Sequence, residues 1–332
     1  MKAGSRRTFL SLVTAAAVGF ALSGEALSQT AAEQTVIGIA NLGPHPSLTK
    51  TIDGFKTEMA KAGYIDGKNV RYAYSDANFT QALMPQMFSQ LVTKQPSLIL
   101  TLTTSVSQVA RSAVPDHKIP LIFAEVTDPV AAGLVPNWTH GGDRFTGASD
   151  LQDFDAMLAF AKRLLPGVKS FGVLYSPGEA NDVVTNQALE AAAKRAGVEF
   201  KAVSVDAVND LAQRAQMLKG VGFVYLTGSN LVQSAIPTVA ASMARLRVPI
   251  ISSETEAIKQ GMASASYAVS LESVGANAAR LAVRVLKGES TASLPVAKPA
   301  ASDYVTSISR REFTKLGLPI PASFESCQCF IN

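Results

Sequence analysis

The chain has 332 residues, of which 47% are hydrophobic and 17% charged, so it can bury a sizeable core and its composition excludes an intrinsically disordered protein. This length allows two domains, because single hydrophobic cores stop growing near ~250–300 residues. The formal net charge is only +4 and the basic residues are dispersed. Nucleic-acid binding, which needs a concentrated basic face, is therefore not expected.

The first 28 residues have the features of an export signal. Lys2, Arg6 and Arg7 form a positive region, an apolar stretch covers residues 12–22, and Ala26-Leu27-Ser28 offers the small residues that a signal peptidase accepts. We therefore predict cleavage near Ser28 and a periplasmic location.

The segment Ser5-Arg6-Arg7-Thr8-Phe9-Leu10 also resembles a twin-arginine signal. An ordinary Sec signal that happens to hold two arginines is the alternative. The apolar stretch is too short to span a membrane, which takes ~20 apolar residues, and no later segment is long and apolar enough. We expect an exported protein that does not itself cross the membrane.

From Thr35 the chain alternates short apolar runs with amphipathic stretches, which is typical of βαβ units and a parallel sheet. Ser47 is expected to cap the first helix, which ends before Gly63. The other elements predicted in the first half are strands at Thr35–Leu42, Asn69–Ser75, Ser97–Thr103 and Ile119–Val126, and helices at Gln81–Thr93 and Ser105–Ala113.

The same order then restarts, and a shorter third part follows. The second half is predicted to hold helices at Gln152–Leu165, Asp182–Ala196, Val208–Lys219 and Val232–Arg245, and strands at Ser170–Tyr175, Glu199–Val205, Gly222–Thr227 and Val248–Ile251. The last third is predicted to hold a helix that Ser270 caps and that ends at Lys287, a strand at Tyr304–Ile308 and a helix at Arg310–Leu316.

Short motifs recur in the same order in both halves, as Lys61-Ala62-Gly63 and Arg195-Ala196-Gly197 illustrate. The repetition predicts two Rossmann-like α/β lobes with parallel sheets, joined by a hinge of three chain segments. We expect crossings near residues 147–149, 266–269 and 297–302. The predicted domains are residues 1–28 as the signal, 35–147 with 268–297 as the first lobe, and 148–267 with 301–326 as the second.

Ligands of open parallel sheets bind beyond the carboxyl ends of the strands, and that rule selects the candidate site. The loops at these ends are rich in hydroxyl, amide and carboxylate groups, and two of them open helices whose free N–H groups attract anions. The candidate ligand-binding residues are Asn41, His45, Thr103, Thr104, Ser105, Thr127, Asp128, Ser149, Tyr175, Asn181, Thr227, Ser229, Asn230 and Glu254.

Several of these residues have a structural alternative. Ser105 and Ser229 are well placed as plain N-caps, and Asp128 before a proline is a common turn former. Tyr175 ends a strand and its ring can belong to the core. Glu254, like Asp150, is a carboxylate that could meet a ligand ammonium group.

Catalytic motifs are not found. The chain has no nucleophile elbow, no Gly-Lys-Ser/Thr phosphate loop and no dinucleotide fingerprint after its first strand. Its three histidines are scattered, so we expect no metal site and no cofactor. Cys327 and Cys329 are expected to form a reactive or idle tail, because one intervening residue would strain a mutual disulfide. The pattern favours a binding protein over an enzyme.

The chain resembles a family of ABC-transporter substrate-binding proteins that includes tryptophan- and tyrosine-type binding proteins. The resemblance covers residues 35–318 and is most specific at two segments, Thr127-Asp128-Pro129-Val130-Ala131-Ala132-Gly133 and Tyr175-Ser176-Pro177-Gly178-Glu179-Ala180-Asn181. It implies a type I periplasmic-binding-protein fold that closes on a small polar ligand, an amino acid or a related small acid. It also implies docking on an inner-membrane permease that a separate ATPase drives.

Two positions depart from the family's pattern. The family often has an acidic residue at the position of Gly228 and another near Ser253, whereas here Glu254 and Glu256 stand close by. A ligand ammonium group would therefore need a different partner in this chain. The alternatives for function are a periplasmic sensing module that serves a receptor and a secreted α/β enzyme.

Overall fold

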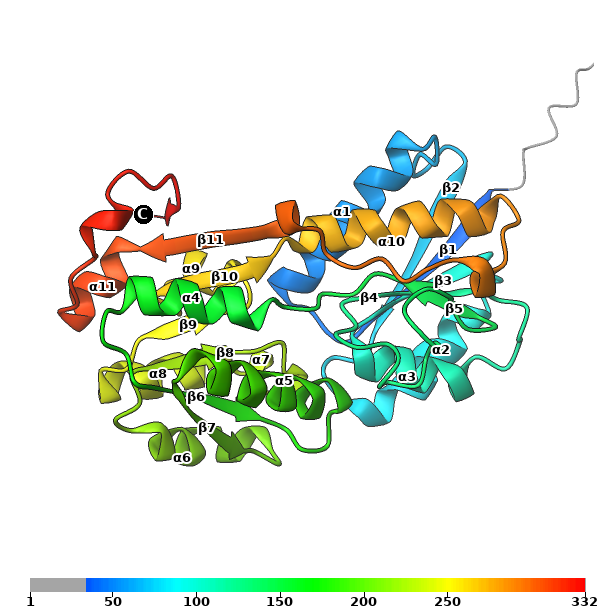
Figure 1. Ribbon diagram of the computed structural model, residues 1–332. Helices are drawn as coiled ribbons and strands as arrows, with labels where there is room; N and C mark the ends of the chain where they lie inside the picture. The colour runs from blue at the N-terminus through cyan, green and yellow to red at the C-terminus, as the bar shows by residue number, and fades with distance from the viewer. Residues whose placement is uncertain (1–33, 332) are drawn as a thin grey trace, which may run out of the picture. The chain divides into compact units, whose positions relative to one another are not determined.

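A computed structural model describes residues 34–331 of the chain (Figure 1). The predicted export signal lies outside these residues. The described chain folds into two β-sheets with mostly parallel strands, each packed against helices, as the sequence predicts. None of the helices within residues 34–331 is both long and apolar enough to span a membrane.

The first sheet has five strands, all parallel, in the order β2-β1-β3-β4-β5. We call this sheet and its helices lobe 1. Its elements are β1 (Thr35–Asn41), α1 (Pro46–Lys61), β2 (Val70–Asp76), α2 (Met84–Val92), β3 (Leu98–Leu102), α3 (Thr104–Ala113), β4 (Leu121–Ala124), β5 (Phe145–Gly147) and α10 (Leu271–Leu286).

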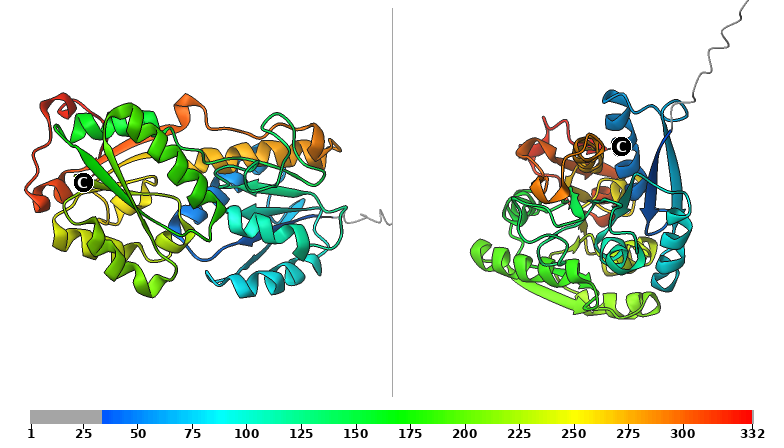
Figure 2. Two further views of the ribbon diagram at one scale, coloured as in Figure 1. Left: turned by 60° about the horizontal axis from the view of Figure 1, so that its bottom comes forward. Right: turned by 90° about the vertical axis from the view of Figure 1, so that its right-hand side faces the viewer.

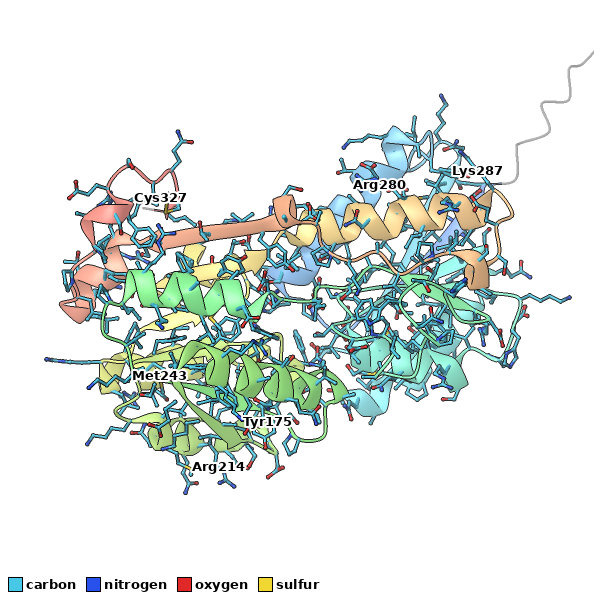
Figure 3. The ribbon with its side chains drawn as sticks, in the orientation of Figure 1. Tyr175, Arg214, Met243, Arg280, Lys287 and Cys327 are labelled. Carbon is cyan, nitrogen blue, oxygen red and sulfur yellow. A yellow bond between two sulfur atoms is a disulfide. The ribbon has the colours of Figure 1, made fainter. Side chains whose placement is uncertain are left out.

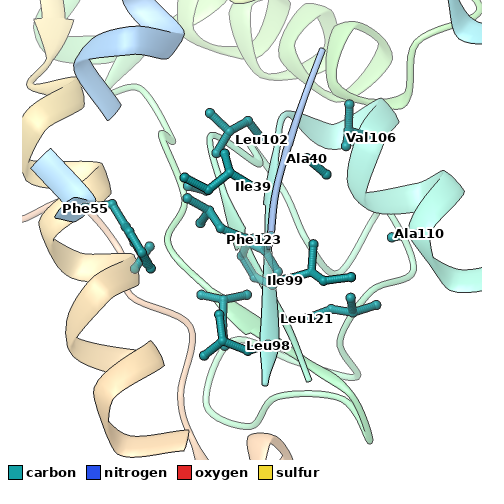
Figure 4. Packing of buried hydrophobic residues seen from close by; sticks show 14 of the residues in the cluster. Ile39, Ala40, Phe55, Leu98, Ile99, Leu102, Val106, Ala110, Leu121 and Phe123 are labelled. Carbon is teal, nitrogen blue, oxygen red and sulfur yellow. The ribbon is translucent and has the colours of Figure 1, made fainter. Parts of the chain in front are cut away.

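Helices cover both faces of this sheet, so its central strands carry apolar residues on both sides. The five residues of β3, Leu98–Leu102, are all buried. In Figure 4, Phe55 of α1 packs on one face of the strands, and Val106 and Ala110 of α3 pack on the other. Figure 2 shows the orange α10 and the cyan α2 on opposite sides of the same sheet.

The second sheet has seven strands in the order β12-β11-β10-β9-β8-β6-β7, and only the β10–β11 pair is antiparallel. We call this sheet and its helices lobe 2. Its elements are α4 (Phe154–Leu164), β6 (Ser170–Tyr175), α5 (Ala180–Ala196), β7 (Glu199–Ser204), α6 (Leu211–Ala215), β8 (Phe223–Leu226), α7 (Asn230–Gln233), α8 (Ile236–Leu246), β9 (Ile250–Ser252), α9 (Glu256–Lys259), β10 (Ala265–Val269), β11 (Tyr304–Ser309), α11 (Arg310–Leu316) and β12 (Phe330–Ile331).

Alternate side chains of β8 pack into two separate hydrophobic cores of lobe 2. Phe223 and Tyr225 face the core under α4 and α5, whereas Val224 and Leu226 face the core under α6 and α8. This period of two is what a strand buried on both faces requires.

The chain passes between the two sheets three times. It leaves lobe 1 after β5, returns after β10 to form α10, and passes back to lobe 2 before β11. A parallel bridge between Ala148 and Ala297 joins the first and third passages. The second passage follows Val269, because residues 266–269, expected as a crossing, belong to the regular strand β10 (Ala265–Val269).

Helices α1 and α10 lie side by side in lobe 1 and approach each other at two glycines (Figure 1). A Cβ atom added to Gly54 would lie 2.2 Å from the carbonyl oxygen of Glu272, and one added to Gly275 would lie 2.0 Å from that of Thr51. Only glycine allows this approach, so these positions fix the spacing of the two helices.

Two local predictions are wrong. The helix expected at Val232–Arg245 is broken into α7 and α8, because Pro237 lacks an N–H group and is accommodated in the first turn of a new helix. Cys327 and Cys329, expected as a reactive or idle tail, are bonded to each other. Both sulfur-bearing side chains pack against the core of lobe 2, at the C-terminal segment that Figure 3 marks at Cys327.

Candidate ligand-binding site

A cavity lies where the carboxyl ends of both sheets meet, and we call it the cleft cavity. It spans about 460 Å³ when the open solvent at its mouth is included. Its lining comes from lobe 1, lobe 2 and the first passage between them: Leu42, His45, Ser47, Leu48, Phe79, Thr103, Thr104, Glu125, Thr127, Asp150, Asn181, Gly228, Asn230, Gln233 and Glu254.

Hydrogen bonds between the lobes close this cavity. The hydroxyl of Ser47 at the start of α1 donates to the carboxylate of Glu254, which follows β9 in lobe 2. At the rim, the amide Nδ2 of Asn230 lies 3.5 Å from the hydroxyl oxygen of Ser105. Both lobes therefore contact each other through side chains that border the cavity.

The position of Ser47 corrects the prediction that it caps α1. His45 is the N-cap, and its Nδ1 accepts a hydrogen bond from the backbone N–H of Ser47 at 3.3 Å. Pro46 occupies the first turn, where its missing N–H costs nothing. The hydroxyl of Ser47 is thereby left free to reach Glu254 across the cleft.

Three carboxylates line the cavity, and no basic side chain among residues 34–331 forms an ion pair with any of them. Burial, together with the charge of Glu254, raises the pKa of Glu125 to about 8. Burial and the charge of Asp150 raise the pKa of Glu254 to about 7. Burial also raises the pKa of Asp150 itself to about 6. Glu125 and Glu254 therefore retain protons near neutral pH.

Hydroxyl donors partly offset this burial. The Thr51 hydroxyl donates to Glu125, as the Ser47 hydroxyl does to Glu254. Both hydroxyls project from the first two turns of α1, so this helix supplies donors to carboxylates that follow β4 and β9. Burial lowers the pKa of His45, which keeps the imidazole neutral beside these acids.

Backbone strain is concentrated at the cavity. Thr103, Glu125 and Phe79 have positive φ angles of 78°, 55° and 58°, although none is a glycine. Such conformations cost of order 1–3 kcal/mol each and are held only where the surroundings impose them. The ring of Phe79 lies on Gly43, where an added Cβ would come within 2.6 Å of the ring. The strain positions these side chains at the site.

Seven of the fourteen predicted site residues line the cavity: His45, Thr103, Thr104, Thr127, Asn181, Asn230 and Glu254. Ser105 lies at the rim, in a neighbouring cavity. It is also not the N-cap of α3, because the helix begins at Thr104 and Thr103 occupies the cap position.

Three predicted residues of lobe 1 and the first passage support the site without lining it. Asn41 donates through Nδ2 to the carbonyl of Gly43 at 2.8 Å and to the hydroxyl of Tyr74 at 2.9 Å. Asp128 accepts from the N–H groups of Val130 and Ala131, which confirms it as a turn former. The Ser149 hydroxyl donates to the carbonyl of Thr127 at 2.9 Å.

Three predicted residues of lobe 2 also lie outside the lining. Ser229 is the N-cap of α7, as its structural alternative predicts. Thr227 is buried, and its carbonyl accepts from Gln233 Nε2 at 2.6 Å. Tyr175 ends β6 within lobe 2 (Figure 3).

Eight lining residues are not among the fourteen predicted site residues, although Asp150 was noted as a carboxylate that could meet a ligand ammonium group: Leu42, Ser47, Leu48, Phe79, Glu125, Asp150, Gly228 and Gln233. Glu125, Asp150 and Gly228 follow the carboxyl ends of strands, so the rule that selected their neighbours also applies to them. Phe79 and Gln233 carry no such signal, because a strained turn and a four-residue helix bring them to the cavity. No cluster of three or more His, Cys, Asp and Glu side chains arranged to hold a metal ion occurs within residues 34–331.

Two α/β lobes with a closed polar cavity between their strand ends define a two-lobed binding protein of the type I periplasmic-binding-protein fold. Residues 36–324 match the family model described as ABC transporter substrate binding protein. The chain belongs to this family.

Three relatives illustrate the similarity. The tyrosine-binding protein of Clostridioides difficile is 32% identical over 265 residues, which cover 80% of this chain and 76% of that protein. An ABC domain from Streptococcus pneumonia, solved in complex with L-Trp, is 29% identical with a TM-score of 0.81, covering 88% of this chain and 97% of that one. The ligand-free, open structure of a Clostridium difficile substrate-binding protein with adhesive properties is also 29% identical, with a TM-score of 0.68, covering 90% and 99%.

At equal sequence identity, the fold matches the L-Trp complex better than the ligand-free, open structure. This agrees with the hydrogen bonds that join the two lobes at the cleft cavity. In this structure the two lobes are therefore in direct contact at the cleft cavity.

Proposed function

We propose that this protein is the extracytoplasmic solute-binding component of an ABC importer and captures an amino acid in the cleft cavity. The observation that carries the proposal is the cavity itself, whose lining comes from both lobes and whose edge is closed by the Ser47–Glu254 hydrogen bond. The relatives described as tyrosine-binding and as bound to L-Trp support an amino acid as the ligand class.

Capture follows from the position of the cavity. A ligand that contacts both lobes binds the closed state more tightly than the open state, and so shifts the equilibrium toward closure. The closed form then docks on an inner-membrane permease that a separate ATPase drives. The predicted export signal, with cleavage near Ser28, delivers the protein to the periplasm where this encounter takes place.

The lining supports an amine-bearing ligand over the related small acid that the sequence also allowed. A small acid brings only a carboxylate, which Glu125, Asp150 and Glu254 repel when they are ionised, whereas an amino acid also brings an ammonium group. An ammonium group offers three N–H donors and the opposite charge.

Mass spectrometry of protein purified without denaturation would identify a ligand released from the cleft, and thermal-shift screening of the twenty amino acids would rank candidates. A ligand that binds only the folded protein raises the melting temperature by mass action. At a ligand concentration one hundred times its Kd, the free energy of unfolding increases by about 2.7 kcal/mol. If no amino acid is released and none raises the melting temperature, the proposal is wrong.

A matched variant ties binding to the cleft. Asn181 faces the cavity, and its Nδ2 lies 3.3 Å from the carbonyl of Gly228. We expect Asn181→Ala to lower ligand affinity, whereas Asn137→Ala, at an exposed turn of lobe 1, leaves affinity unchanged.

A further inference from the structure

The ionisable side chains that line the cleft cavity are mostly acidic. Its lining includes Glu125, Asp150 and Glu254 but no lysine or arginine, and His45 is its one potentially basic side chain within the described residues. A neutral amino acid carries a single ammonium group and a carboxylate of its own. Its net charge is zero, so it would not offset the negative charge that Glu125, Asp150 and Glu254 acquire when they ionise.

Three buried side-chain oxygens that border the cavity have no hydrogen-bond partner in residues 34–331: Asp150 Oδ1, Gln233 Oε1 and the hydroxyl of Thr104. The first two are acceptors only. Gln233 Nε2 donates to the carbonyl of Thr227 at 2.6 Å, which orients the amide and leaves Oε1 as an acceptor for a ligand. Buried acceptors without donors are costly, and a ligand rich in N–H groups removes that cost.

A second cavity continues from the cleft cavity toward the rim, and we call it the outer cavity. The two share Leu42, Phe79 and Asn230, and the outer cavity encloses about 910 Å³ including open solvent. Its lining also contains two acids, Glu179 and Asp206, and no basic residue. A ligand longer than the cleft cavity therefore extends into a space of the same charge sign.

We propose that the ligand is a cation with more than one amino or guanidino group, such as a basic amino acid or a diamine, rather than a neutral amino acid. One ammonium group meets Asp150 and Gln233 in the cleft cavity, and the second extends past Phe79 into the outer cavity. This inference rests on the proposed capture function and specifies its substrate class.

Protonation supports the same inference. The raised pKa values of Glu125 and Glu254 show that burial of uncompensated negative charge is unfavourable at this site. A cationic ligand supplies the compensating charge, so its capture releases protons from these carboxyls near neutral pH.

The test compares lysine with analogues that lack its carboxylate, its second ammonium group or both ammonium groups. Isothermal titration at pH 8 with lysine, 1,5-diaminopentane, norleucine and hexanoate separates the contributions of the second ammonium group and of the carboxylate. We expect lysine or the diamine to bind at least about tenfold more tightly than norleucine, since ion-paired hydrogen bonds are roughly twice as strong as neutral ones, and hexanoate not to bind.

The outcomes separate the two proposals. If norleucine, tyrosine or tryptophan binds as tightly as lysine and the diamine, the cationic-ligand inference is wrong while capture of an amino acid stands. If no amine or amino acid binds, the capture function fails as well.

A charge-matched pair of variants locates the effect. Asp150→Asn removes a carboxylate from the cleft cavity, whereas Asp155→Asn removes one from the exposed surface of α4. We expect Asp150→Asn to weaken binding of the tightest cationic ligand about tenfold or more, and to weaken binding of norleucine less. Asp155→Asn should leave the affinity for both ligands unchanged. Equal weakening of both ligands by Asp150→Asn would overturn the inference.

Discussion

The buried carboxyl of Glu125 should make the ligand-free protein less stable as the pH rises. Its pKa is about 8 in the folded protein, above its usual value of 4.5, because the carboxyl is buried near Glu254 and Asp150. Between these two values the folded state holds a proton that the unfolded state has lost, so the free energy of unfolding falls with increasing pH.

The magnitude follows from the shift. Each unit of pKa difference corresponds to 1.36 kcal/mol, so the Glu125 carboxyl lowers the stability by at most about 4 kcal/mol at pH 8. This is an upper limit, because separation of the lobes rehydrates the carboxylate. Glu125→Gln removes the charge and keeps an oxygen that accepts the Thr51 hydroxyl. We expect the variant to gain up to that amount at pH 8 and little at pH 4.5.

Urea unfolding of ligand-free protein between pH 4.5 and 8.5 measures the effect, with Glu190→Gln on the exposed surface of α5 as the control. The control should parallel the native protein at every pH. If Glu125→Gln also shows the pH dependence of the native protein, burial of this carboxyl does not govern the stability and the reasoning is refuted.

Three further predictions concern other contacts. Ser47→Ala removes the hydrogen bond that joins the lobes at Glu254, so small-angle scattering should show a larger radius of gyration without ligand and ligand affinity should fall several-fold. Gly275→Ala places a Cβ atom 2.0 Å from a carbonyl oxygen of the facing helix, and should lower the free energy of unfolding by ~1–3 kcal/mol or more. Gly178→Ala is the control. The nearest atom to its added Cβ would lie 3.8 Å away, so the free energy of unfolding should change little. Replacement of both Cys327 and Cys329 by serine should cost less than about 2 kcal/mol, because the disulfide closes a very short loop.

Each of these has a contrary result. An unchanged radius of gyration and affinity would show that the Ser47 hydrogen bond does not hold the lobes together. Equal stability of the two glycine variants would show that α1 and α10 can separate at no cost. A loss of secondary structure in the double serine variant would show that the disulfide stabilises more than the tail.

Much of the fold was predictable because its strands are short apolar runs between amphipathic helices. The strand Ser170–Tyr175 was predicted at its observed bounds. β5 was not predicted, since three residues, Phe145–Gly147, are too few for a periodic signal. β10 was expected as a crossing because its alanine and serine content is typical of a linker, yet pairing with β9 and β11 makes it a strand.

The candidate site was predictable to the extent that it follows strand ends. Thr104, Asn181 and Glu254 came from that rule and line the cavity. Ser47 and Phe79 did not, because one depends on which residue caps a helix and the other on a strained turn. Both depend on tertiary contacts that a local pattern does not contain.

The close approach of α1 and α10 has a practical consequence. Gly54 and Gly275 bring the two backbones together, and α10 begins two residues after β10 of lobe 2. The two helices should therefore move as one rigid body when the lobes separate, and α1 carries the Ser47 hydroxyl near the same end, where Lys50 of α1 pairs with Glu272 of α10. A fluorescent dye at Arg280, exposed on the outer face of α10 and paired with Glu58 of α1 (Figure 3), would then report occupancy of the cleft from outside it, which offers a route to a reagentless sensor.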